Sequence, residues 1–277
     1  MKVKGKITVK KFVRARKAMS PAVSATIMVA VTVVLVLVAS NYAYQTLERQ
    51  RGSAEFDAVK KSILALDDAV RDVAWDIGGT RSVRFTVNYG HIKLVPNALS
   101  ININVTDYPV NFGSYTTGYL KYNISTNYVT FDEGYEEYLL GNQSVVISKS
   151  TESYGKILVK QEGSWVNVIL TYRVLVLKTC SVNVTIGDQP TIVNYVDIYV
   201  IRLLMSERST YVGDFDLKAK NIGIVTETSE SYDVIDSTCS ILVTIGSYSE
   251  TITVSLVGGT DAKVVFNLHV SNVQISI

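Results

Sequence analysis

The side chains that most often carry catalysis or bind metals are few and scattered in this 277-residue sequence. His91 and His269 are the only histidines, and neither stands in a Cys/His cluster or in the HExxH pattern of a zinc site. The GxSxG, GxxxxGKS/T and GxGxxG patterns, which place a nucleophile or bind phosphates, do not occur. We therefore expect no enzymatic activity, no metal and no cofactor.

Acidic side chains gather at Asp132-Glu133 and Glu136-Glu137. Carboxylates of this kind can bind Ca²⁺, but the surrounding tyrosines make a solvated loop the simpler explanation. A carboxylate pair for glycoside hydrolysis would come together only in the fold, and no pattern in this sequence favours one.

The two cysteines occupy equivalent positions of an internal repeat. Residues 179–187 (TCSVNVTIG) and 238–246 (TCSILVTIG) agree at seven of nine positions. In strands, an alternation of period two would point Cys180 and Cys239 toward the core. If the domain is exported, a Cys180–Cys239 disulfide is expected, stabilising it by up to about 4 kcal/mol. The alternative is two buried free thiols.

Four triplets match the acceptor pattern of N-glycosylation, Asn-x-Ser/Thr. Those that begin at Asn104 and Asn183 alternate with apolar residues, so these two asparagines are expected to face solvent. We expect some of the four to be modified, and not all. The four candidate acceptors are Asn104, Asn123, Asn142 and Asn183.

Basic residues are concentrated at the N-terminus. Eight of the 27 lysines and arginines lie within residues 1–17, where there is no acidic residue. The remaining 19 basic and 25 acidic residues give the body a net negative charge. A basic arm can bind nucleic acid, but this arm runs directly into an apolar segment. We interpret its charge as topogenic and expect no nucleic-acid partner.

The apolar segment extends from Ala18 to Leu47 without a charged side chain. About 20 apolar residues in a helix span a hydrocarbon core of roughly 30 Å, and we place this part at about residues 20–47. A lone segment in lipid can satisfy its backbone only as a helix, even when it is rich in valine. The basic flank precedes the segment, which predicts a cytoplasmic N-terminus and export of the remainder. A conventional signal peptide cut near Val38-Ala39-Ser40 is the competing interpretation, but its apolar core would be only about 7–15 residues long.

A second helical pattern continues beyond Gly52. Gly78-Gly79 supplies a helix end, so we expect one long helix over residues 19–79, with Gly52-Ser53 as the place where it can bend or melt. Its apolar stripe packs either on the protein's own β domain or on helices of identical neighbours, and the sequence leaves both open. The stripe has spacings of three and four, at Phe56, Val59, Ile63, Leu66, Val70, Val73 and Ile77.

The residues from Arg16 to Thr26 (RKAMSPAVSAT) resemble the class III signal peptides of archaeal type IV pilins and related surface proteins. In that family a basic leader ends in a charged residue followed by Gly or Ala, and a prepilin peptidase cuts before the apolar helix. The resemblance implies a leader over residues 1–18 that ends in Lys17 and Ala18, with Met19 as the first mature residue. Val23 stands where bacterial pilins have glutamate, which fits the archaeal branch.

A cut in front of the helix keeps it in the mature protein. The resemblance therefore implies a structural subunit of an archaeal type IV pilus-like cell-surface filament, used in adhesion or motility, whose helices form the filament core. Its partners would be identical subunits, the membrane before assembly, the prepilin peptidase and the pilus assembly machinery. Filaments of this family are commonly glycosylated. The alternative is a monomeric surface adhesin or ligand-binding protein anchored by the same helix.

From Arg81 onward the apolar period changes to two. Strand-like runs, for example residues 82–87, 100–105, 165–177 and 192–204, are separated by turn signals such as Glu162-Gly163-Ser164. We expect an α+β protein in which the long hydrophobic helix precedes an antiparallel β-sandwich, Ig-like or jelly-roll-like, over residues 80–277. This β-rich domain would lie outside the cell.

Overall fold

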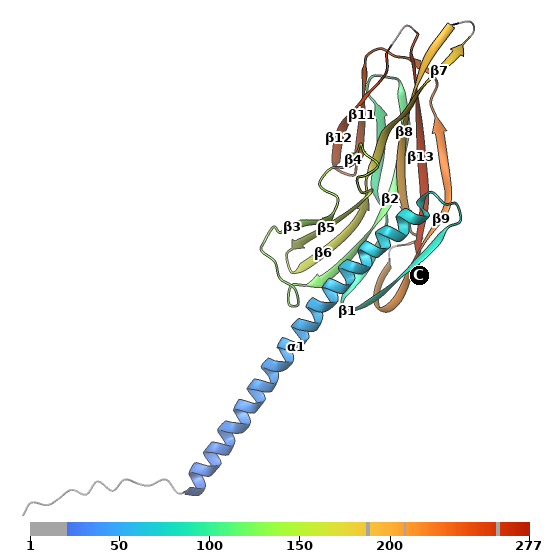
Figure 1. Cartoon of the computed structure of the whole chain (residues 1–277). Helices are drawn as coiled ribbons and strands as arrows, with labels where there is room; N and C mark the ends of the chain where they lie inside the picture. The colour runs from blue at the N-terminus through green and yellow to red at the C-terminus, as the bar shows by residue number, and fades with distance from the viewer. Residues whose placement is uncertain (1–20, 187–188, 208, 259–260) are drawn as a thin grey trace, which may run out of the picture. The chain divides into compact units, whose positions relative to one another are not determined.

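A computed structural model describes residues 21–277 apart from 187–188, 208 and 259–260 (Figure 1). Within this part of the chain, one apolar helix precedes a β-rich body, which confirms the expected order. The elements are α1 (Pro21–Ala74), β1 (Thr80–Val105), β2 (Val110–Ser125), β3 (Glu136–Leu140), β4 (Val146–Ile147), β5 (Gly155–Glu162), β6 (Trp165–Tyr172), β7 (Val174–Ile186), β8 (Gln189–Leu204), β9 (Ser209–Thr228), β10 (Tyr232–Asp233), β11 (Thr238–Ile245), β12 (Tyr248–Ser255) and β13 (Lys263–Ser276).

The described residues divide into two units, one that ends at Leu47 and one that spans Glu48–Ile277. In the first unit, the apolar part of α1 is helical despite its many valines, as expected. A stretch of 18 residues there has a mean hydropathy of 2.5 and no buried residue. The hydroxyl of Thr46 donates to the carbonyl of Tyr42 four residues earlier, at 2.9 Å. Such bonds satisfy a polar side chain within an otherwise apolar helix.

The second unit begins within α1, which continues through Gly52 and Ser53 without interruption. The expectation of a bend or a melted turn at this point is wrong. A Cβ atom at Gly52 would lie 2.6 Å from the Cβ of Tyr128, in the segment after β2. The glycine is therefore explained by the close approach of this tyrosine to the helix, and not by a need for helix flexibility.

The apolar stripe of α1 packs on the protein's own β domain. Six of its seven expected members are buried, from Phe56 to Val73, in a cluster with residues of β1, β2, β5, β6, β8, β9 and β13. We call this cluster the helix core; its members include Ile63, Phe85 and Leu170. For these six residues the choice left open by the sequence is decided in favour of intramolecular packing.

Ile77 does not continue the stripe on the β domain, so its expected packing within the chain is wrong. The helix ends at Ala74, about one turn earlier than expected, and the Ile77 side chain is 68% exposed. Gly78, with φ of 84°, lies in the turn that leads to β1. The expected helix end at Gly78-Gly79 therefore marks this turn, and not the last turn of the helix.

The thirteen strands of the described residues form one mixed sheet, in the order β3-β5-β6-β2-β1-β9-β13-β8-β7-β4. Strand β11 pairs with β1, β12 pairs with β11, and β10 pairs with β13. The expectation of a purely antiparallel sheet is wrong, because β13 runs parallel to β8 and β4 runs parallel to β7. The cause of the first exception is topological. Strand β13 lies between the consecutive strands β8 and β9, and a strand antiparallel to β9 must run parallel to β8.

The central strands β8 and β13 contribute side chains to two separate hydrophobic cores. Val200 of β8 and Val270 of β13 belong to one core, whereas Ile201 and Val273 belong to the helix core. Successive side chains of a strand point to opposite faces, so the two cores lie on opposite faces of the sheet. The second, which we call the hairpin core, packs β11 and β12 on β1, β7, β8 and β13, and includes Ile103, Cys239, Val243, Phe266 and Leu268.

Candidate functional site

The expected leader cleavage site, Lys17-Ala18-Met19, lies outside the described residues. The described part of the apolar segment presents large hydrophobic side chains to its surroundings along its whole length, for example Val29, Leu35 and Leu37. An apolar surface of this extent is unfavourable in water and needs lipid or other apolar helices around it. By length and composition the segment is suited to membrane insertion, as a span or as a signal anchor.

A buried carboxylate attaches the second part of α1 to β1. The side chain of Glu55 accepts hydrogen bonds from the backbone N–H groups of Asn88 (2.6 Å), Tyr89 (3.0 and 3.1 Å) and Gly90 (2.9 Å). The hydroxyl of Tyr122 donates to the same carboxylate at 3.0 Å. The pairing of β1 with β9 is interrupted between Val87 and Ile92, which leaves these amides free to surround an anion.

Burial and the negative charge of Glu55 both raise the pKa of Tyr122, so its hydroxyl stays protonated and remains a donor. This bond joins β2 to the helix in addition to the three amides of β1.

The carbonyls at the end of α1 are capped by side chains of the sheet. Asn221 of β9, which is fully buried, donates from Nδ2 to the carbonyls of Val73 (3.1 Å) and Ala74 (2.7 Å). The hydroxyl of Ser271 in β13 also donates to the Ala74 carbonyl. The last carbonyls of a helix have no partner within it, so these donors explain why α1 ends at Ala74.

A second acidic residue of α1, Asp67, is buried against the sheet, with 1% of its surface exposed. Its Oδ2 accepts from Nε of Arg71 at 3.0 Å, and a Cβ at Gly155 would lie 2.0 Å from its Oδ1. Burial raises the pKa of Asp67, although the positive charge of Arg71 acts in the opposite direction. Together with Glu55 and the cap, this contact fixes the stripe to the domain, which leaves it unavailable for packing on neighbouring subunits.

The expected Cys180–Cys239 disulfide is wrong, because both cysteines are free. Residues 179–183 of β7 are all exposed, so neither face of the strand is covered there. Cys180 is therefore exposed, whereas Cys239 of β11 is buried in the hairpin core, where burial raises its pKa to about 11.

The candidate glycosylation sites differ in their accessibility. Asn104 and Asn183 are exposed, as expected, and Asn142 is exposed as well. Asn123 is only 6% exposed, and its Nδ2 donates to Oδ1 of Asn167 on the neighbouring strand β6. The folded domain therefore offers no free amide at Asn123 for a sugar.

The histidines and the acidic loop form no shared site. His91 packs edge-on against Trp165, and His269 stacks on Tyr199, 3.9 Å from a carboxylate oxygen of Asp197. Among the described residues, no group of three or more His, Cys, Asp or Glu side chains is placed to hold a metal ion. Of the acidic loop, Glu136 begins strand β3 and faces a pocket.

This pocket, of about 300 Å³, is a feature that the sequence did not indicate. Its floor is formed by β2, β3, β5 and β6, on the face that points away from α1. In β5, Lys156, Leu158 and Lys160 line the pocket, while the alternate residues Ile157 and Val159 belong to the helix core. The turn between β11 and β12 and the segment 143–145 close the other side.

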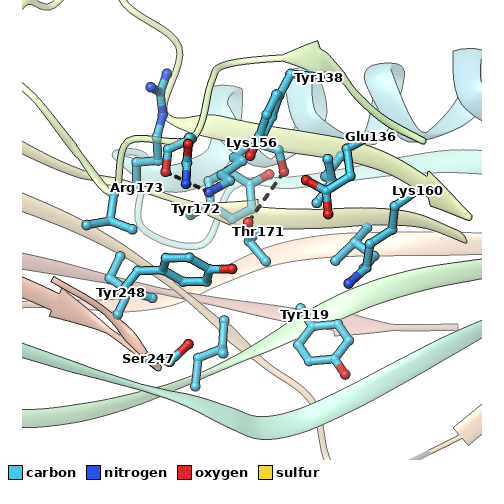
Figure 2. A pocket seen from close by; sticks show the side chains of 16 residues that line it. Tyr119, Glu136, Tyr138, Lys156, Lys160, Thr171, Tyr172, Arg173, Ser247 and Tyr248 are labelled. Atoms are coloured by element: carbon cyan, nitrogen blue, oxygen red, sulfur yellow. Dashed lines mark hydrogen bonds between the residues drawn. The ribbon is translucent and has the colours of Figure 1, made fainter. Parts of the chain in front are cut away.

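Cationic and aromatic side chains dominate the pocket (Figure 2). The ammonium group of Lys156 lies 5.5 Å from the ring centroids of both Tyr138 and Tyr248 and donates to the carbonyl of Gln143 at 3.0 Å. Burial and the nearby charge of Arg173 lower the pKa of Lys156. This lysine therefore sits in a partly desolvated, electropositive environment.

Arg173 contributes its positive charge from beneath the surface. It is 3% exposed, and its Nη1 donates to Oδ1 of Asn142 at 3.0 Å while Nη2 donates to the carbonyl of Ser153. Burial lowers the pKa of this guanidinium.

The chain matches no known family model, no curated protein and no solved structure in comparisons of its sequence and fold.

Proposed function

We propose that this protein is a structural subunit of a type IV pilus-like cell-surface filament, without catalytic activity, that polymerises through the apolar part of α1. The main observation is that the two parts of this helix differ in exposure. Residues 23–47 expose an uncharged apolar surface, whereas the apolar stripe from Phe56 to Val73 is buried in the protein's own core. Of the apolar surface of α1, this first part therefore remains to pack on identical subunits.

Three further features support the proposal. The basic N-terminus and the acidic body fit an exported domain with its N-terminus inside. The class III-like junction at Lys17-Ala18-Met19 would retain the helix after processing. Glu55, Asp67 and the cap hold the second part of α1 within its own domain, so the apolar first part is the part of the helix that remains for assembly.

Processing and imaging of the native material test the proposal together. Filaments sheared from cells should have uniform width in electron microscopy, and N-terminal sequencing of their subunits should begin at Met19. A mature protein that begins at Ser40 or Asn41 would refute it, because the helix would then be lost. Dispersed particles beginning at Met19 would instead support a monomeric anchored adhesin.

Crosslinking locates the contact between subunits. In a Cys180→Ser background, Val31→Cys in the apolar helix should form dimers with a short bifunctional thiol reagent in assembled material. Val212→Cys, an equally exposed position in β9, is the matched control and should not. Equal crosslinking of the two variants would contradict assembly through the helix.

A further inference from the structure

We propose that the pocket between β5 and the β11–β12 turn binds an acidic sugar residue, that is, a pyranose that carries a carboxylate. The inference goes beyond the filament function and needs only that the β domain is exposed to glycans. It rests on the chemistry of the lining side chains, their origin from separate strands and the size of the pocket.

The tyrosines supply faces on which a sugar ring can pack. Tyr119 comes from β2, Tyr138 from β3 and Tyr248 from β12, so aromatic surface borders the space from three elements (Figure 2). The C–H groups of a pyranose face are apolar and slightly positive, and they pack well on the negative face of an aromatic ring. These three rings, together with the buried Tyr172 in the lining, fit a ring-shaped, partly apolar ligand better than a bare anion.

The lysines select for negative charge. Lys156 and Lys160 project from alternate positions of β5 into the pocket, and Arg173 adds a third positive charge nearby. Among the described residues that line the pocket, Glu136 is the one acidic side chain. It is in register with Lys160 on the neighbouring strand and is placed to accept hydrogen bonds from sugar hydroxyls. Glu250 lies outside the lining, and its negative charge acts on both Lys156 and Arg173 and offsets part of their positive charge. The two lysines remain the charged groups that line the space itself, which favours a carboxylated sugar over a neutral one.

The partners of the two lysines leave capacity for a ligand. Lys156 makes one hydrogen bond, to the carbonyl of Gln143, while an ammonium group has three donors. Lys160 pairs with Glu162 at 2.5 Å, on a carboxylate whose side chain is half exposed. Such an exposed pair is weak and exchanges readily with another anion. A volume of about 300 Å³ lies at the lower end of the range for small-molecule sites, as expected for one or two sugar units.

Titration calorimetry on the full chain in detergent micelles tests the inference, with digalacturonate as the acidic probe. Saturable binding is expected, and neutral digalactose should bind about tenfold more weakly or worse, which corresponds to the loss of one charged hydrogen bond. Inorganic phosphate should not compete with digalacturonate. Absence of saturable binding, equal affinity for the neutral disaccharide, or full competition by phosphate would each overturn the acidic-sugar assignment.

Variants assign the binding to this pocket. Lys160→Gln and Tyr248→Ala should each weaken digalacturonate binding about tenfold. Both side chains reach the surface, so unchanged thermal unfolding is expected to show an intact fold. Lys220→Gln in β9 removes the same charge from an exposed position outside the pocket and should leave the affinity unchanged. Equal affinities of the Lys160→Gln and Lys220→Gln variants would overturn the assignment to this site.

Failure of this inference is distinguishable from failure of the filament proposal. Sugar binding is measured on protein in micelles and does not require assembly. Conversely, Lys160→Gln should assemble normally in electron microscopy if the filament proposal holds, whatever its sugar affinity.

Discussion

Replacing Glu55 by glutamine tests whether a single carboxylate fixes helix α1 to the sheet. The carboxylate accepts from three backbone N–H groups and from the Tyr122 hydroxyl. Glutamine keeps one oxygen and turns an NH₂ group toward donors, which leaves one or two buried N–H groups unpaired. Each such group costs about 1–3 kcal/mol, so we expect the free energy of unfolding to fall by about 2–4 kcal/mol.

Urea unfolding of the full chain in micelles, followed by the fluorescence of Trp75 and Trp165, measures this loss. Glu48→Gln is the matched control, because Glu48 lies about two turns earlier in α1 and forms a partly exposed ion pair with Arg51 at 3.6 Å. Surface pairs contribute roughly 0–1 kcal/mol. If Glu55→Gln and Glu48→Gln destabilise the protein equally, the reasoning about the backbone amides is wrong.

A double-mutant cycle with Tyr122 separates the hydroxyl from the amides. Tyr122→Phe removes only the donor at 3.0 Å and should lower the stability by about 1 kcal/mol. In the Glu55→Gln background the same substitution should have a smaller effect, because its acceptor has already changed. Additive effects would show that the two side chains do not interact.

Four other changes have defined outcomes. Asn221→Ala removes the cap of the Val73 and Ala74 carbonyls and should lower the free energy of unfolding by about 2–3 kcal/mol. Asn102→Ala, at an exposed position of β1, is the control and is expected to lose about 1 kcal/mol or less. Gly52→Ala should destabilise by about 1–3 kcal/mol, because its Cβ would meet Tyr128, and Tyr128→Ala should restore part of the loss in the double variant. The raised pKa of Asp67 means that the folded state binds its proton more tightly than the unfolded state, so this stabilisation is complete below the unfolded pKa, near 3.8, and is lost as the pH rises through the folded pKa. The asparagine in Asp67→Asn cannot ionise, so the free energy of unfolding of this variant, relative to that of the native sequence, should increase between pH 3 and pH 7 in urea titrations. A difference that stays constant with pH would contradict the raised pKa of Asp67. Finally, a maleimide should label Cys180 of the folded protein much faster than Cys239, because Cys180 is exposed and Cys239 is buried. Peptide mapping by mass spectrometry measures the two rates, and equal rates would contradict the burial of Cys239.

The sequence predicted those features that depend on local periodicity. The uncharged run from Ala18 to Leu47 and the spacing of three and four from Phe56 to Val73 are properties of a helix that need no knowledge of its neighbours. The alternation in Cys239, Ile241 and Val243 likewise predicted a strand with one buried face, and all three are buried. In each case the pattern is repeated over enough residues to define a buried side.

Other features depend on partners far along the chain, which a local pattern does not contain. The last turn of α1 is set by Asn221, about 150 residues away, so Ile77 continues the spacing of the stripe without continuing the helix. Residues 179–187 repeat the sequence of 238–246, yet both faces of β7 are exposed at residues 179–183, whereas Cys239, Ile241 and Val243 of β11 are buried. No local rule distinguishes the two copies.

By itself, then, the sequence determined that an apolar helix precedes a β-rich body and which side of each repeated segment is apolar, because those are properties of side-chain spacing. Only the tertiary structure decided that β13 enters between β8 and β9, that Glu55 meets the amides of β1, and that lysines of β5 face tyrosines of β2, β3 and β12 across one pocket. The physical reason is that strand order and register bring together residues that are distant in the chain, and these contacts are specified by the packing of the whole domain.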